Sequence, residues 1–277
     1  MLVRAKLVTA FTAGLIVSSS AIADAIVPIV NTLPRCDNCS VGPVNIGFSI
    51  DFFGNNYSQL FVNNNGSVSF DYGLYNFTFD SLVFESSYRP QPTPVISPFF
   101  SGVDTRYAGS PVTYGNLIYE GHTAFAVNWL DVDYYSPSGG LHTERNSFQL
   151  LLVERSDTGA GNFDFIFNYD SIQWDNKNIW DTSFFGYAAG GDFYGYMTES
   201  NLLLPLKSSP LPYNSDQLPY NSRNSDVPGR YVFEVRNGVV TNPLPLLTIP
   251  EPETWAMLLA GLGVVTGVAR RRAKAAG

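Results

Sequence analysis

Hydrophobic and polar residues alternate along several short stretches in the middle of the chain. In residues 163–170 aromatic residues occupy every second position, and the positions between them are mostly polar. A period of two predicts a β-strand with an aromatic face and a polar face. Residues 230–236 show the same period, whereas residues 125–130 and 148–153 are apolar at nearly every position. We expect these two continuous runs to be central strands of a sandwich, apolar on both faces.

A β-hairpin is predicted over residues 59–70. Two short strand-like segments flank the sequence Asn63-Asn64-Asn65-Gly66. An Asn-Gly pair accepts the positive φ angles of a tight primed turn, so this sequence is expected to form the turn of the hairpin.

The body of the chain has no long apolar stripe at helical spacing. The full chain has 24 glycines and 18 prolines, and those in the body interrupt most candidate helices. The hydrophobic content of 45% and the aromatic content of 14% are too high for an intrinsically disordered chain. The sequence therefore predicts an all-β fold, an antiparallel β-sandwich or barrel-like single domain.

Residues 1–23 have the order of a secretory signal peptide. A basic start precedes an apolar run, and small residues stand at Ala21 and Ala23. This order predicts export and cleavage by signal peptidase after Ala23, with Ala25 as the alternative site.

The C-terminal end combines a short apolar segment with a basic cluster. Residues 255–269 carry no charge and are followed by Arg270, Arg271 and Arg272. As a helix this segment would span roughly 22 Å, short of the roughly 30 Å hydrocarbon core of a bilayer. We expect a short hydrophobic helix that anchors the chain in a membrane, with the basic cluster on the cytoplasmic side.

Residues 250–277 resemble the PEP-CTERM sorting signal of Gram-negative bacteria. That signal has a Pro-Glu-Pro motif, a polar and aromatic spacer, an apolar helix and an arginine-rich end. The matching residues are Pro250, Glu251, Pro252, Thr254, Trp255, Arg270, Arg271 and Arg272. The resemblance implies transient anchoring in the inner membrane, processing by an exosortase, and delivery to the cell surface or extracellular matrix. An ordinary C-terminal anchor would explain the apolar run and the arginines, but not the Pro-Glu-Pro motif.

The two ends conceal the charge of the body. Of the 24 acidic and 16 basic residues, two and six lie in the ends, so residues 24–250 keep 22 and 10 and carry a formal charge of −12. An acidic body repels a phosphate backbone, which excludes nucleic acid as a partner. We divide this body into an N-terminal flank (24–44), a β domain (45–236) with an exposed loop (206–228), and a proline-rich linker (237–249).

Residues 45–236 of the body resemble the nidogen-like (NIDO) domain of extracellular matrix and adhesion proteins. The matching segments follow the family's order: 52–54 with Tyr57, 61–70, 96–100 with Asp104 and Thr105, 126–129, 146–150, 165–169 with Ile172 and Trp174, 185–187 with Gly190, and 229–233. Two positions depart from the family pattern. Phe100 replaces a tryptophan, and Gly102 stands where the first aspartate of an Asp-x-Asp pair is expected. The resemblance thus leaves Asp104 as the candidate cation ligand of that pair.

The only cysteines, Cys36 and Cys39, lie in the polar N-terminal flank. In an exported chain they either bond to each other or stay as a local thiol pair. Zinc would need a second pair of ligands, and His122 and His142 do not stand at a zinc-finger spacing. We expect a disulfide that staples the flank.

The sequence has no common catalytic motif. Gly-x-Ser-x-Gly, His-Glu-x-x-His and a glycine-rich phosphate loop are all missing. Asp131 and Asp133 are two apart on a predicted strand and so point to one face, an arrangement that a glycosidase with paired carboxylates could use. Two solvated carboxylates near a strand end are the simpler interpretation. Calcium is the cofactor that such acids suit best, but the further spaced acids of a calcium loop are lacking.

These observations predict a non-enzymatic, exported surface or extracellular-matrix protein. The expected roles are cell-matrix adhesion or association with exopolysaccharide through the nidogen-like domain. Tyrosine, asparagine and serine in loops suit an extracellular glycan or a matrix protein as the ligand. The alternatives are a secreted glycan hydrolase that uses Asp131 or Asp133, and a purely structural matrix component.

Overall fold

The computed structural model describes residues 31–75, 93–137, 139, 141–175, 183–189, 193–197 and 215–243. Their elements, in chain order, are β1 (Asn31–Thr32), β2 (Ser40–Phe52), β3 (Asn55–Asn63), β4 (Ser67–Ser69), β5 (Val95–Phe100), β6 (Val103–Gly109), β7 (Thr113–Tyr119), β8 (His122–Tyr134), β9 (Asn146–Glu154), β10 (Phe163–Ile172), β11 (Phe184–Ala188), β12 (Phe193–Met197), the 3-10 helix η1 (Ser215–Tyr220), β13 (Arg230–Arg236) and β14 (Val239–Val240). The signal peptide and the C-terminal hydrophobic helix predicted above lie outside the described residues.

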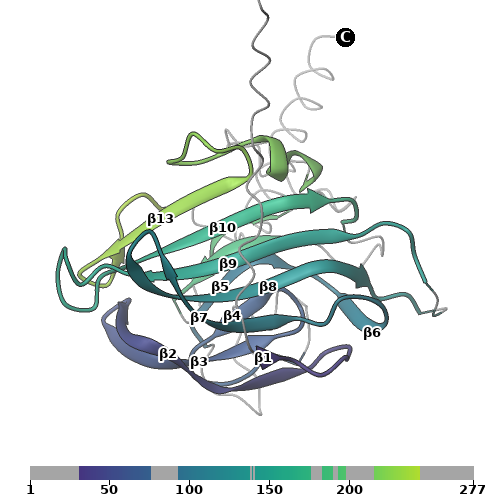
Figure 1. The fold of residues 1–277 in the computed structure, drawn as a ribbon, viewed down its shortest axis with the longest axis horizontal. Coiled ribbons are helices and arrows are strands. Elements are labelled where there is room, and N and C mark those ends of the chain that lie inside the picture. Colours follow the sequence, from purple (N-terminus) through teal and green to yellow (C-terminus); the bar gives the residue numbers. More distant parts are fainter. Residues whose placement is uncertain are drawn as a thin grey trace, which may run out of the picture.

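The strands form two antiparallel sheets that pack face to face. The larger sheet has the order β1-β7-β8-β9-β10-β13-β14, with β6 also paired to β8, and the smaller sheet has the order β12-β11-β5-β4-β3-β2. Figure 1 shows β8, β9, β10 and β13 side by side in the larger sheet. The all-β, single-domain sandwich is therefore confirmed, and the sheets do not close into a barrel.

The predicted strand patterns correspond to the centre of the larger sheet. Residues 163–170 lie in β10, residues 230–236 form β13, and the two continuous apolar runs lie in β8 and β9. These four strands are neighbours, since β9 pairs with β8 and β10, and β10 pairs with β13. β10 and β13 have apolar inner faces and mostly polar outer positions, which explains the alternation in their sequences, whereas β8 and β9 are buried on both faces over much of their length.

Aromatic side chains fill the space between the two sheets. The ring of Phe165 stacks on Phe233 at 4.7 Å within the larger sheet and meets Tyr187 of the smaller sheet edge-on at 5.4 Å. Polar atoms of the buried rings are also satisfied across this space. Tyr169 donates its hydroxyl to the carbonyl of Pro98 at 2.6 Å, and the Trp129 indole donates to the carbonyl of Asn64 at 3.0 Å. Each sheet therefore supplies both apolar cover and hydrogen-bond partners for the other.

The predicted hairpin is present as β3 and β4, but its turn differs from the predicted one. Asn63 pairs with Ser67, which leaves a three-residue loop in which only Gly66 has a positive φ, of 80°. Two-residue loops with positive φ at both positions, as in primed turns, instead occur at Phe53-Gly54, Glu120-Gly121 and Asn237-Gly238. The asparagine-rich loop is buried, and the side chain of Asn64 donates to the carbonyl of Val103 at 2.6 Å.

Regular structure extends into segments that we had assigned as flank, loop and linker. β1 and the start of β2 lie within 24–44, and β14 lies within 237–249. In the segment 206–228 the structure places η1, where Leu218 is 2% exposed and Tyr220 is 68% exposed. Along the described part of the chain, no helix is both long enough and apolar enough to cross a bilayer.

Candidate functional site

One face of the larger sheet packs against the smaller sheet, and we call its opposite face the outer face. It consists of the side chains of β8, β9, β10 and β13 that alternate with those of the core. An apolar band crosses its middle and is almost completely buried, at 0–5% exposure. The band comprises Ala124, Ala126, Leu151, Val153 and Ile166, with Leu117, Tyr119 and Val232 packed against it.

On one side of this band a row of amides crosses the sheet. Gln149 donates to the side-chain carbonyl of Asn128 at 2.6 Å, and Asn168 donates to that of Gln149 at 2.9 Å. Arg230 completes the row, since its Nε donates to Asn168 Oδ1 at 3.0 Å. The three amides are fully buried and directly paired in the strand register. The row therefore fixes the position of Arg230 at its end.

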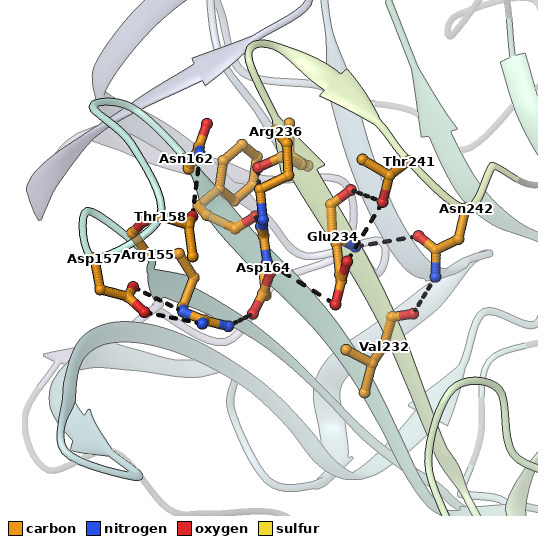
Figure 2. Close-up of polar contacts among 12 residues, drawn as sticks. Arg155, Asp157, Thr158, Asn162, Asp164, Val232, Glu234, Arg236, Thr241 and Asn242 are labelled. Atoms are coloured by element: carbon orange, nitrogen blue, oxygen red, sulfur yellow. Dashed lines mark hydrogen bonds and ion pairs between the residues drawn. The ribbon is translucent and has the colours of Figure 1, made fainter.

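On the other side of the band, Asp164 lies between two arginines, as Figure 2 shows. Its carboxylate oxygens are each 2.7 Å from an arginine nitrogen, one of Arg155 and one of Arg236. Asp157 accepts two further hydrogen bonds from Arg155, both at 3.0 Å. These bonds to Asp157 and Asp164 raise the pKa of the Arg155 guanidinium, and the same guanidinium lowers the pKa of Asp157. The charges of this cluster are thus paired with one another.

A pocket of about 360 Å³ opens on the outer face where these three features meet. Its lining residues come from the β7–β8 turn, β9, β10, β13 and the segment before β13. They are Tyr119, Glu120, His122, Val153, Arg155, Asp164, Ile166, Ser225, Arg230 and Val232. Its volume lies at the lower end of the range of small-molecule sites. The pocket combines apolar side chains with convergent polar groups, which is typical of such sites.

Electrostatic interactions connect opposite sides of the pocket. Burial raises the pKa of the Tyr119 hydroxyl, Arg230 opposes that rise, and the Glu120 carboxylate adds to it. Tyr119 ends β7 and Glu120 begins the β7–β8 turn, whereas Arg230 begins β13. The charge of Arg230 is therefore felt on the far side of the pocket.

The predicted carboxylate pair, Asp131 and Asp133, does not share one environment. A register shift between Trp129 and Val132 interrupts the strand alternation, and Asp131 has a φ of 52°. The Asp131 side chain is 62% exposed, whereas that of Asp133 is 3% exposed. Arg145 lies 3.9 Å from the first carboxylate and 3.3 Å from the second. The prediction of one shared face is wrong, because the bulge redirects the strand.

Asp133 instead belongs to a buried cluster beneath the strand end. Its Oδ1 is 2.9 Å from His142 Nδ1, and the His142 ring stacks on Tyr134 at 3.8 Å. The backbone amides of Tyr134 and His142 also donate to this carboxylate. These contacts hold the loop after β8 in place and leave Asp133 with a structural role.

The candidate cation ligand Asp104 is 5% exposed and is occupied by an arginine. Arg106 donates to both of its carboxylate oxygens, at 3.0 Å to Oδ1 and at 2.7 Å to Oδ2. Asp37 lies on the other side of Arg106 at 3.4 Å. Within the described ranges, no group of three or more His, Cys, Asp or Glu side chains is arranged to hold a metal ion.

Cys36 and Cys39 form a disulfide, with their Cα atoms 6.1 Å apart. The loop that it closes docks on the asparagine-rich turn and on β6. The amide of Asn64 donates to the carbonyl of Cys39 at 2.8 Å, and the amide of Thr105 donates to the carbonyl of Cys36 at 2.9 Å. The stapled loop thus joins the two sheets at this end of the sandwich.

The predicted processing residues of the signal peptide and of the sorting signal lie outside the described part of the chain. They are Ala21, Ala23, Pro250, Glu251, Pro252, Thr254, Trp255, Arg270, Arg271 and Arg272. The last described residues, Asn242 and Pro243, lie shortly before them. Their carbonyls accept hydrogen bonds from Arg223, and the Asn242 side chain bonds to the edge of β13 at Val232 and Glu234 (Figure 2).

The pocket residues Tyr119, His122, Arg155 and Arg230 were not among the predicted site residues. Their signal in the sequence was weak, because they come from three separate segments of the chain, around positions 120, 155 and 230, which meet only after the strands of the larger sheet pair. The polar positions of β10 and β13 did carry one part of the signal, since Asp164 and Arg236 alternate with aromatic residues. Without the register, nothing indicated that they face each other.

Comparisons with known proteins agree with this architecture. A protein-family model described as the nidogen-like domain matches residues 58–237, and one described as the PEP-CTERM protein-sorting motif matches residues 248–273. Alpha-tectorin of Mus musculus is 27% identical over 243 residues and alpha-tectorin of Homo sapiens is 27% identical over 236 residues. Both alignments cover 73% of this chain and 10% of the relative, so the chain spans about a tenth of their length. No solved structure matches this chain significantly.

Both resemblances expected from the sequence are thus confirmed. A nidogen-like domain followed by this sorting motif characterises an exported protein of the cell surface or extracellular space, and the motif implies processing by an exosortase. The domain match covers more than half of the chain. The chain belongs to the nidogen-like domain family and ends in a PEP-CTERM protein-sorting motif.

Proposed function

We propose that this protein is a non-enzymatic adhesion protein of a Gram-negative bacterium. Its sandwich binds an exopolysaccharide or a matrix protein at the cell surface or in the extracellular matrix. The order of the two family matches carries this proposal, because the nidogen-like domain ends at 237 and the sorting motif follows at 248. During sorting, the C-terminal segment holds the chain transiently in the inner membrane until the exosortase acts.

Two structural observations support binding rather than catalysis. The side chain of Asp131 is exposed and that of Asp133 is buried, and Arg145 lies near both carboxylates. They therefore do not form a pair that flanks an open position for a glycosidic bond. The outer face, in contrast, offers a pocket with apolar and polar lining. A pocket lined by paired charges and aliphatic side chains suits recognition more than proton transfer.

The sorting part of the proposal is tested by mass spectrometry of the mature protein from its native host. We expect the first 23 residues and about the last 25 to be absent. A matched chain in which Glu251 is replaced by Gln and Pro252 by Ala should keep its C-terminal end and stay in the membrane fraction. A mature wild-type protein that still ends at Gly277 would contradict exosortase processing.

The adhesion part is tested by comparing the wild-type strain with a strain that lacks this protein. Loss of the protein should reduce retention of cells on purified host exopolysaccharide, and supply of residues 24–250 in excess should compete with wild-type cells. Hydrolysis is assayed in parallel with the same polymer. Release of reducing ends by the wild type, abolished in Asp131→Asn, would favour the hydrolase alternative.

A further inference from the structure

We propose that the outer-face pocket between the β7–β8 turn and β13 binds a carboxylate-bearing sugar, such as a uronic acid residue of a matrix glycan. This inference rests on the proposed adhesion function and specifies its ligand. The pocket contains none of the site residues predicted from the sequence. The class of ligand that it would bind follows from the polar groups in its lining that have no partner in the described part of the protein.

Arg230 is the cation of the pocket that has donors to spare. Its Nε donates to Asn168, but no partner of its two terminal nitrogens is found among the described residues. The row of buried amides holds the Nε in place, and Arg230 lines the pocket. A planar guanidinium with both terminal nitrogens free matches a carboxylate, which it binds through two parallel hydrogen bonds.

The other charges of the pocket compete little with this role. Asp164 is bonded to two arginines at 2.7 Å each, and Arg155 is bonded to two carboxylates. Glu120 lies at an exposed turn, where solvent screens its charge. Among the charged groups in the pocket, Arg230 is thus the one whose charge a ligand would neutralise.

The remaining lining suits the body of a sugar ring. Val153, Ile166 and Val232 supply an aliphatic floor, and Tyr119 packs beside it. The carbon-bound hydrogens of a pyranose stack favourably on such apolar and aromatic surfaces. His122 has no hydrogen-bond partner in the described part of the chain, so its ring nitrogens are available to sugar hydroxyls.

A peptide carboxylate would satisfy Arg230 equally well, but the pocket favours a sugar. Its polar groups are spread around an aliphatic floor, on the scale of a small ligand, at about 360 Å³. The body of the protein carries a formal charge of −12, so its overall field repels a polyanion. We therefore expect recognition of single acidic sugars within a glycan of low charge density, rather than of a dense polyanion.

The test is calorimetric titration of residues 24–250 with a short oligosaccharide that contains glucuronic acid, and with the same oligosaccharide after reduction of its carboxyl groups. We expect binding of the acidic form and at least tenfold weaker binding of the reduced form. Arg230→Gln should lose the same tenfold preference, and His122→Ala should weaken both forms by a smaller factor. Arg106→Gln, which removes one positive charge on β6 outside the pocket, should bind like the wild type.

Each other outcome has a defined meaning. Equal binding of the acidic and reduced oligosaccharides, or an unchanged preference in a folded Arg230→Gln protein, would overturn the proposal. Wild-type binding of an acidic peptide but not of the sugar would also overturn it. Cells whose adhesion to exopolysaccharide survives Arg230→Gln would retain the adhesion function while the pocket proposal fails. Cells that never depended on this protein for adhesion would refute the proposed function itself.

Discussion

Asp164 is the residue on which the charge balance of the outer face depends. It is 7% exposed, and it is bonded to Arg155, which directly follows β9, and to Arg236 at the end of β13. Asp164→Asn would leave two partly buried guanidinium groups facing a neutral amide. We expect a loss of about 2–3 kcal/mol in the free energy of unfolding, because removal of one partner of a buried ion pair leaves uncompensated charge. Urea denaturation followed by circular dichroism measures this loss.

Glu234→Gln is the matched control for Asp164→Asn. Glu234 is on the same face, but its side chain is 52% exposed and its carboxylate is 3.9 Å from Arg236. An exposed pair of this kind contributes about 0.5 kcal/mol or less. Equal effects of the two substitutions would show that burial does not govern the outer-face cluster.

Asp37 makes a contribution to stability that falls as pH rises. Its Oδ1 is buried without a hydrogen-bond partner in the described structure, and burial raises the pKa of its carboxyl although Arg106 opposes the rise. The ordinary value is about 3.9, so the folded state holds the proton more tightly than the unfolded state. Stability is therefore greatest below the unfolded pKa and declines as pH rises through the raised folded pKa. Asp37→Asn should raise the melting temperature at pH 7, and this gain should vanish near pH 3.

Asp157 provides the control of opposite sign. Arg155 lowers the pKa of its carboxyl, so its contribution is present above the unfolded pKa and is lost as pH falls through the folded pKa. Asp157→Asn should slightly lower the melting temperature at pH 7 and have no effect in acid. Melting curves of both variants across this pH range separate the two signs. A gain in Asp37→Asn that persisted in acid would contradict a titration origin.

At this scale the sequence identified the residue types but not their surroundings. Asp131 and Asp133 obey the period of two in the sequence, yet a bulge separates their environments. Asp104 matched an acidic position of the family pattern, yet its carboxylate forms an ion pair with Arg106. Bulges and side-chain pairing depend on the register between strands, which a single strand does not encode.

At the scale of elements, the asparagine-rich turn between β3 and β4 is fixed by its glycine. A Cβ atom on Gly66 would lie 1.8 Å from the carbonyl oxygen of Phe99, and the residue has a φ of 80°. Gly66→Ala should lower the free energy of unfolding by at least about 3 kcal/mol, because both overpacking and backbone strain act together. Chemical denaturation of the purified variant, or its recovery in the insoluble fraction, measures this effect.

Gly121→Ala separates the two causes. Gly121 has a φ of 85° in the β7–β8 turn, but no atom lies within 4 Å of the position of an added Cβ. Its substitution should therefore cost only the backbone term, roughly 1–2 kcal/mol. If Gly66→Ala were no more harmful than Gly121→Ala, the close packing of the turn against β5 would not matter for stability.

Strand identity was easier to predict than turn geometry. β10 and β13 were predicted because one face of each is continuously aromatic or aliphatic, and the hairpin was predicted from its asparagines and glycine. The three two-residue turns with positive φ at both positions were not predicted, although Asn237-Gly238 has the favoured sequence for a primed turn. Phe53 takes a positive φ of 53° against the preference of a bulky residue, where its ring stacks against Tyr194. Tertiary packing overrides local preference there.

At the scale of the whole molecule, the two sheets should unfold together. The hydroxyl of Tyr169 and the indole of Trp129 each bond to the opposite sheet, and the aromatic core is shared. We expect residues 24–250 to show one transition in urea, with the same midpoint by tryptophan fluorescence and by far-ultraviolet circular dichroism. Two separated midpoints would mean that the sheets are independent folding units.

The architecture of the molecule was predictable, whereas its candidate site was not. The chain's composition and strand patterns indicated a sandwich, and the terminal motifs indicated export. The pocket required the order of strands in the larger sheet, in which β13 pairs with β10 across a long stretch of sequence. Contacts between distant segments of this kind do not leave a local periodicity in the sequence.

The bonds from Arg223 to the carbonyls of Asn242 and Pro243 fix where the chain leaves the sandwich. Pro250 follows only seven positions after Pro243, a reach of at most about 25 Å for an extended chain. Asn242 also bonds to Val232, which lines the pocket. A mature protein attached to the envelope through this short segment would hold the pocket close to the envelope surface.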